Sequence, residues 1–158
     1  MSKFGSLVAA PAEVFRVEII YPATDKPLRD KDGNVCWIDV VSSDGPAGRA
    51  FDKEERAAAF RRARRSRSNT DDGADQLEVN IAKCAALTKS WYLVDPETKE
   101  KLDVPCTVEN AKELYAAPGM NWLFVQPFTA AHDAANFIPS SAKGSTPSQS
   151  ESSKASGS

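Results

Sequence analysis

"EVFRVEIIYPATDKPLRDKDGNVCWIDVVS", residues 13–42, is the stretch of the sequence that decides the fold. Apolar side chains alternate with polar ones at both of its ends, as in half-buried β-strands. Two prolines and an Asp-Gly pair between these ends supply turn chemistry, so the stretch predicts an antiparallel hairpin with a longish loop. The alternating apolar positions are Phe15, Val17, Ile19 and Tyr21 in the first strand and Cys36, Ile38 and Val40 in the second.

Two helices are predicted after the hairpin. Residues 52–67 begin with Asp52 and Glu55 at the spacing of a capping box and continue in strong helix formers. After a break, Asp75 and Glu78 repeat this N-terminal signal and precede an amphipathic pattern with a period of about 3.6 residues. The apolar side of this second helix comprises Leu77, Ile81, Cys84, Thr88 and Trp91.

The next segment predicts an extended piece and two further helices. Residues 92–106 are expected to run out and back around a turn at Asp95-Pro96. Thr107 can cap the following helix, and the fixed φ of Pro118 suits the first turn of the last helix. The helix after Thr107 carries the apolar residues Val108, Ala111, Leu114 and Tyr115.

These elements together predict an α+β fold, with the β-hairpin packed on a small helical bundle. We expect a flexible N-terminus over residues 1–12, one domain over residues 13–138 and a disordered tail over residues 139–158. Nine of the 20 tail residues are serine and none is a bulky hydrophobe, so the tail cannot offset its chain entropy. The predicted core comprises Phe15, Val17, Ile19, Ile38, Leu77, Ile81, Trp91, Leu114, Tyr115 and Trp122.

The composition is typical of one cytosolic globular domain. The 158 residues are 41% hydrophobic and 27% charged, which is enough for one modest core. No apolar run reaches the ~18 residues of a membrane span, and the N-terminus has too short an apolar stretch for a signal peptide. Cys36, Cys84 and Cys106 lie too far apart in the sequence to outline a zinc site or a disulfide framework, so we expect reduced thiols, no metal and no cofactor.

No residue pattern predicts catalysis. His132 is the single histidine, and Asp133 beside it would lie on a different face of a helix, which argues against a catalytic dyad. Residues 30–34, "DKDGN", resemble a calcium loop, but the glycine comes too early and no glutamate closes the loop. A hairpin turn is the better interpretation. Because glycine-rich phosphate-binding motifs are also absent from the sequence, we expect a non-enzymatic protein.

A basic segment spans residues 49–67. It holds eight Lys/Arg and three Asp/Glu, whereas the rest of the chain holds 12 basic and 19 acidic residues. On a helical wheel the arginines point in nearly every direction and leave a weak apolar strip of Ala59, Phe60 and Ala63 to dock on the domain. Such a helix is solvated, covered by an acidic protein or used for phosphate contacts with nucleic acid. The arginines are Arg56, Arg61, Arg62, Arg64, Arg65 and Arg67.

Bulky apolar side chains meet a helix breaker in residues 121–128, "NWLFVQPF". On a straight helix these side chains spread around most of the circumference, which is more than the single stripe of a surface helix. Either they pack in the core, with Pro127 kinking the helix, or part of them forms a partner surface. We expect Trp122 to anchor the helix, and Phe124 and Phe128 on the opposite side to face solvent or a partner.

The order of these features resembles the tail assembly chaperones of long-tailed bacteriophages. In that family a β-hairpin with a turn like "YPAT" (21–24) precedes a basic helix, and a central helix ends in a tryptophan, as "CAALTKSW" (84–91) does. A helix like "NAKELY" (110–115) then leads to a W-x-x-x-Q helix (122–126) that closes on "ANF". The resemblance covers about residues 13–138. This chain departs from the family in its last helix, where phenylalanines and a proline replace charged or small residues.

The resemblance implies an assembly factor of the host cytoplasm without catalytic residues. Such a chaperone binds the long, aggregation-prone tape-measure protein and helps to recruit tail-tube subunits around it. Many relatives also make a longer product by a programmed ribosomal frameshift, near the position of the serine-rich tail in this chain. Self-association is a further expected use of the binding surface, and a small nucleic-acid-binding regulator is the alternative function. The predicted partner-binding residues are Leu123, Phe124, Phe128, Arg61, Arg62, Arg64 and Arg65.

Overall fold

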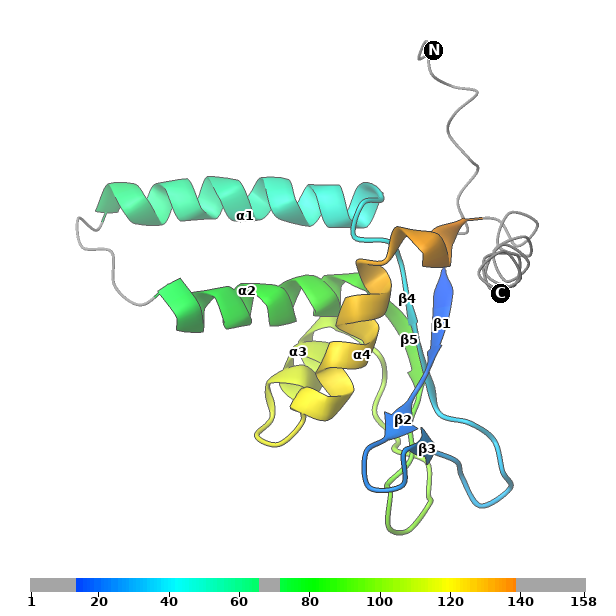
Figure 1. Ribbon diagram of the computed structural model, residues 1–158. Helices are drawn as coiled ribbons and strands as arrows, with labels where there is room; N and C mark the ends of the chain where they lie inside the picture. The colour runs from blue at the N-terminus through cyan, green and yellow to red at the C-terminus, as the bar shows by residue number, and fades with distance from the viewer. Residues whose placement is uncertain (1–13, 66–71, 139–158) are drawn as a thin grey trace, which may run out of the picture.

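Four α-helices and a small antiparallel sheet make up residues 14–65 and 72–138, which the computed structural model describes (Figure 1). The predicted α+β fold class is therefore confirmed. The segments predicted as a flexible N-terminus and a disordered tail, residues 1–12 and 139–158, lie outside the described residues. The sheet has the strand order β1-β4-β5, with β1 at Phe15–Glu18, β4 at Trp37–Val40 and β5 at Thr88–Tyr92.

The predicted hairpin is confirmed as the pair of β1 and β4. The two strands are antiparallel and place Val17 opposite Ile38. The loop between them contains β2 (Ile20–Tyr21) and β3 (Lys26–Pro27), which form a second, two-stranded sheet. The predicted inner face of the second strand is correct, because Cys36, Ile38 and Val40 are all buried.

The basic helix, α1 (Pro46–Arg65), begins earlier than the predicted residue 52. The fixed φ of Pro46 suits the first helical position. Asp52 thus lies inside the helix, and its carboxylate pairs with Lys83 Nζ of the next helix at 2.9 Å. The predicted capping box of Asp52 and Glu55 is wrong, because the helix starts at a proline six residues before it.

The amphipathic helix, α2 (Asp72–Leu87), begins before the predicted N-terminal signal at Asp75 and ends before the predicted Thr88 and Trp91, and the chain continues directly into β5. Thr88 and Trp91 therefore belong to a strand, and their predicted place on the helix is wrong. Their segment is rich in β-branched and aromatic residues, and it pairs with β4, a partner far away in the sequence. Thr88 Oγ1 also donates to the Cys84 carbonyl oxygen at 2.8 Å, which stabilises the last turn of α2.

The last two helices lie on one side of the sheet (Figure 1). In α3 (Val108–Ala116), the Thr107 hydroxyl accepts a hydrogen bond from the Asn110 N–H at 3.0 Å, so the predicted cap is confirmed. The last helix, α4 (Asn121–Ala131), begins after Pro118, which lies in the turn before it, so the predicted place of Pro118 in the first helical turn is wrong. The helix contains Pro127, and the 3₁₀-helix η2 (Ala134–Phe137) follows it. Among the described residues, no helix is long and apolar enough to cross a membrane.

The core lies between the inner face of the sheet, the end of α2, and the helices α3 and α4. Four predicted core residues are buried and five are half-buried against the core. Leu77 is the wrong prediction, because α2 extends beyond the sheet and leaves this side chain 51% exposed. The four buried residues are Val17, Ile19, Ile38 and Tyr115, and the five half-buried residues are Phe15, Ile81, Trp91, Leu114 and Trp122.

Candidate partner-binding surfaces

The apolar run of α4 belongs to the core rather than to a partner surface. Leu123 is buried, Phe124 is only 5% exposed, and the ring of Phe124 lies 5.7 Å from that of Tyr115. Phe128 is half-buried and stacks on the Phe124 ring at 5.2 Å. Because α4 contacts α2, α3 and the sheet at once, apolar side chains are needed on most of its circumference. The prediction that Leu123 and Phe124 face a partner is therefore wrong.

The side chain of Gln126 joins α4 to the backbone of β2. Its side-chain oxygen accepts a hydrogen bond from the Ile20 N–H at 2.8 Å, and its side-chain nitrogen donates to the Ile20 carbonyl at 2.9 Å. The same nitrogen donates to the Trp122 carbonyl at 2.9 Å. The amide of Gln126 thus supplies one donor and one acceptor to backbone groups that lie outside the β1–β4 ladder. The glutamine of the W-x-x-x-Q pattern has this structural use.

The four predicted binding arginines lie at the end of α1 that projects furthest from the sheet (Figure 1). Arg61, Arg64 and Arg65 are exposed, and none of them forms an ion pair within the described part of the chain. Arg62 is exposed as well, and it donates to the Glu55 carboxylate at 2.8 Å. This end of the helix is therefore a projecting cationic surface.

Phe60 directly precedes these arginines on α1, and its side chain is 66% exposed. The Arg64 guanidinium lies 6.0 Å from the centre of its ring. The strip of Ala59, Phe60 and Ala63 was predicted to dock on the domain, but all three residues are exposed. This prediction is wrong, because α1 turns a different side toward α2, the side that carries Asp52.

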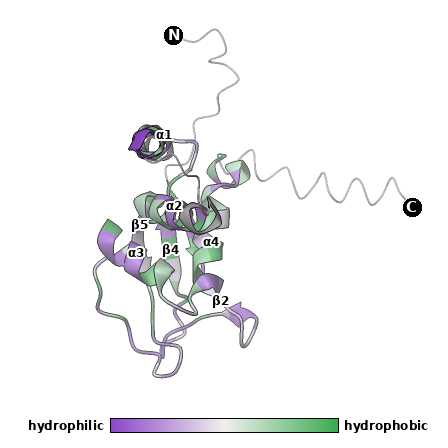
Figure 2. Ribbon diagram, turned by 90° about the vertical axis from the view of Figure 1, so that its left-hand side faces the viewer, coloured by the Kyte–Doolittle hydropathy of each residue, from purple (hydrophilic) through white to green (hydrophobic). Residues whose placement is uncertain are grey.

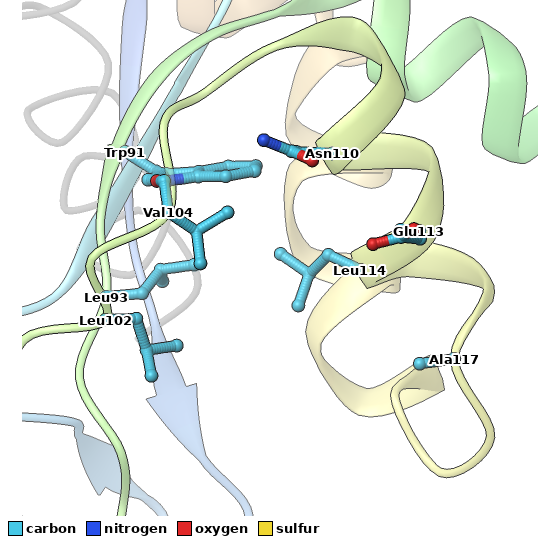
Figure 3. Close-up of a pocket in the computed structure, with 8 residues that line it drawn as sticks. All are labelled: Trp91, Leu93, Leu102, Val104, Asn110, Glu113, Leu114 and Ala117. Atoms are coloured by element: carbon cyan, nitrogen blue, oxygen red, sulfur yellow. The ribbon is translucent and has the colours of Figure 1, made fainter.

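A second open surface is an apolar groove between α3 and the strand segment that follows β5 (Figure 3). Its volume is about 320 Å³. One wall forms because the chain returns after its turn and the Leu102 N–H donates to the Leu93 carbonyl at 2.9 Å. The Trp91 indole N–H donates to the Val104 carbonyl at 3.0 Å, which holds the returning segment against β5. The groove is lined by Trp91, Leu93, Leu102, Val104, Asn110, Glu113, Leu114 and Ala117.

The groove combines exposed apolar side chains with an acidic rim. Leu102 is 39% and Val104 is 47% exposed, although both side chains are aliphatic. Glu113 lines the groove, and Glu109 lies one helical turn before it on α3. Neither glutamate has an ion-pair partner in residues 14–65 and 72–138. The groove can therefore bind an apolar side chain whose neighbours are basic.

Sequence reasoning missed this groove for a specific reason. Trp91 was assigned to a helix, whereas the wall of the groove depends on Trp91 lying in a strand. The alternation of Leu102 and Val104 around a polar residue was the available signal, because it places both apolar side chains on one side of an extended segment.

The "DKDGN" loop is a turn held by the Asp30 carboxylate. One oxygen accepts hydrogen bonds from the N–H groups of Asp32 and Asn34, and the other accepts from the Asn34 side chain and the Tyr92 hydroxyl. The Tyr92 hydrogen bond lowers the pKa of Asp30 to about 2 and raises the pKa of Tyr92 to about 12. This carboxylate is thus used by its own loop.

Other titratable residues also have local structural partners. The His132 ring stacks on Phe128 at 4.3 Å, while the Asp133 carboxylate accepts from the Ala135 N–H and caps η2. The three cysteines are free thiols, and burial raises the pKa of Cys84 to about 12. Within the described ranges, no group of three His, Cys, Asp or Glu residues is placed to hold a metal ion.

Comparison of the chain with protein-family models, with curated proteins and with solved structures finds no match. The resemblance to tail assembly chaperones therefore stays a prediction from the order and spacing of sequence motifs. Two surfaces of the described domain are available to a partner, namely the cationic end of α1 and the acidic-rimmed apolar groove.

Proposed function

We propose that this chain is a non-enzymatic tail assembly chaperone of a long-tailed bacteriophage. In this proposal it holds the tape-measure protein in the host cytoplasm and helps to recruit tail-tube subunits. Two lines of reasoning support the proposal. The first is the order of sequence motifs over residues 13–138, with the exception of Trp91, which lies in β5 and not at the end of the central helix. The second is an open apolar groove that the fold itself leaves unfilled.

The groove is the observation that carries the proposal. A chaperone must offer apolar area to its client and still remain dissolved, which an apolar recess bordered by charged residues achieves. Trp91 and Leu114 form apolar walls, and Glu113 stands at the rim (Figure 3). An amphipathic helix can bind such a groove by inserting one apolar side chain per turn. The tape-measure protein is the client that the family resemblance implies.

Co-expression with the client tests this function. The adjacent tape-measure gene is expressed with the wild-type chain or with Val104→Asp, which places a charge in the groove beside an acidic rim. We expect the wild-type chain to keep the client soluble and to co-purify with it, and Val104→Asp to lose most of the client, because removing a central apolar contact costs about 2 kcal/mol or more.

The matched control is Val108→Asp. Val108 is also an exposed valine, but it lies at the start of α3, on the side of the helix turned away from the groove residues Asn110 and Glu113. A carboxylate in the first turn of a helix is electrostatically favourable, so the control keeps the fold. Equal client recovery with both variants, or none with the wild-type chain, contradicts the proposal.

A nucleic-acid-binding regulator is the second candidate function. It rests on the exposed Arg61, Arg64 and Arg65 at the projecting end of α1. Binding through these residues and their neighbours makes the affinity for duplex DNA or RNA fall with salt, with a log–log slope of magnitude roughly 3–5. A filter-binding titration at low salt that finds no affinity tighter than about 100 μM removes this candidate.

A further inference from the structure

The outward side of α1 presents one aromatic residue between two arginines. The half-buried side of the helix carries Phe51 and Asp52, and the ion pair of Asp52 with Lys83 identifies it as the side that faces α2. Phe60 follows Phe51 by nine residues, which at about 100° per residue places it on the opposite side. Arg56 and Arg64 lie one turn before and one turn after Phe60 on that same side.

The side chains around Phe60 leave its ring accessible. Ala57 and Ala63 flank it on the helix surface, and both are short and exposed. The Phe60 ring is therefore the most prominent apolar group on the outer side of α1. Figure 2 shows this helix end-on, mostly hydrophilic in colour and at the outside of the molecule. An aromatic ring flanked by arginines is the composition that protein interfaces favour at their centres.

The groove beside α3 has the complementary pattern. Its walls are apolar, and Glu109 and Glu113 lie one turn apart along α3 without ion-pair partners among the described residues. Lys112 lies on another side of α3, because it is two residues from Asn110 and one from Glu113, both of which line the groove. A basic helix with an aromatic residue at its centre thus matches this site in both polarity and charge sign.

The α1 helix of the same chain cannot occupy this groove. The helix α2 lies between α1 and α3 in both views (Figures 1 and 2), and it contacts each of them. The distal end of α1, which carries Phe60, also points away from the sheet (Figure 1). Contact between the two surfaces therefore requires a second copy of the chain.

We propose that α1 of one copy docks in the groove of a second copy, with Phe60 against Trp91 and Leu114 and with Arg56 and Arg64 facing Glu109 and Glu113. The contact joins two different surfaces, so it is heterologous, and every added copy leaves one helix and one groove open. Such a contact builds head-to-tail chains or closed rings. This inference does not depend on the identity of the client.

Sedimentation velocity of the purified, nuclease-treated full chain tests the contact. We expect association that grows with protein concentration and weakens with salt, because the flanking ion pairs are exposed to screening. Phe60→Ser and Val104→Asp should each weaken it about 30-fold, the usual effect of removing a central interface residue. Leu77→Ser is the matched control, since Leu77 is an exposed apolar residue of α2 and lies outside the proposed contact.

Mixing the two defective variants is the sharper test. The Phe60→Ser chain keeps its groove and the Val104→Asp chain keeps its helix, so together they can form one contact and no more. At concentrations where each variant alone is monomeric, the mixture should give a 1:1 complex that does not grow further. A two-fold symmetric contact between α1 helices does not produce this result.

Exchanging the charges of the proposed ion pairs between two copies tests the orientation of the contact. Glu113→Arg alone should weaken association, and Arg56→Glu with Arg64→Glu in the other copy should restore it. Three outcomes overturn the proposal: a monomer at every concentration up to about 1 mM, the weak limit of specific binding; association that Phe60→Ser leaves unchanged; or association that requires added nucleic acid. The Phe60→Ser chain keeps its groove, so its client recovery should not fall below the wild-type level, and this inference and the proposed function can fail separately.

Discussion

At the scale of single residues, the domain is held together by a few side chains that satisfy backbone groups outside the main sheet. Gln126 does so for Ile20, and Asp30 does so for its own turn. These hydrogen bonds are exposed, so each contributes the modest net stability of a hydrogen bond that competes with water. Each of these two residues therefore allows a direct test.

Replacing Gln126 by Ala should destabilise the domain by about 0.5–1.5 kcal/mol, the usual net contribution of a hydrogen bond, because the Ile20 N–H and C=O exchange this partner for water. Gln126→Glu should also destabilise it, since a carboxylate can accept from the Ile20 N–H but cannot donate to the Ile20 carbonyl. Denaturant unfolding gives the free energy of unfolding for both variants. A change below about 0.5 kcal/mol, which is typical of a neutral surface substitution, contradicts this account.

The loop of Asp30 should make stability depend on pH at both extremes. The pKa of this carboxyl is lowered to about 2 in the folded protein, so its contribution is present above its ordinary pKa and is lost as the pH falls through about 2. The pKa of Tyr92 is raised to about 12, so its contribution is complete below about 10 and is lost as the pH rises through about 12. Melting temperatures of the wild type and Tyr92→Phe should therefore differ between these limits and converge outside them. Parallel curves at every pH contradict the assignment.

At the scale of elements, the features set by local sequence were predictable, whereas those set by contacts between distant segments were not. The β1–β4 hairpin and the Thr107 cap were predictable because alternation and capping act over a few residues. The strand at Trp91 was missed because β4, which pairs with it, is far away in the sequence. The burial of Phe124 was missed because a helical wheel does not show that α2, α3 and the sheet all contact α4. The groove depends on the first of these tertiary features, because Trp91 of β5 forms part of its wall.

The position of α4 in the core predicts a large effect at Phe124. Phe124→Ala should cost about 3–5 kcal/mol of unfolding free energy, as expected for a buried aromatic side chain that leaves a cavity. Val125→Ala on the same helix is the control, because Val125 is 40% exposed and should change the stability much less. Thermal unfolding followed by circular dichroism compares the two variants. Equal stabilities would place Phe124 outside the core.

At the scale of the whole molecule, a compact body carries two open surfaces of opposite charge. The helix α1 with its cationic end lies on one side of α2, and α3, which forms one wall of the acidic-rimmed groove, lies on the other side (Figure 1). The sequence suggested an assembly chaperone and placed its binding residues on α4, where Leu123 and Phe124 are buried, and on the exposed arginines of α1. The structure directs the search for the client to the groove instead.

The most direct test of the groove as the client site is site-specific photo-crosslinking. A photoreactive phenylalanine analogue replaces Val104 in the groove, or Val108 on the other side of α3, in cells that also make the tape-measure protein. Illumination should join the client to the chain from position 104 and only weakly from position 108. Equal crosslinking from both positions, or crosslinking from position 108 alone, would contradict the assignment of the groove as the client-binding site.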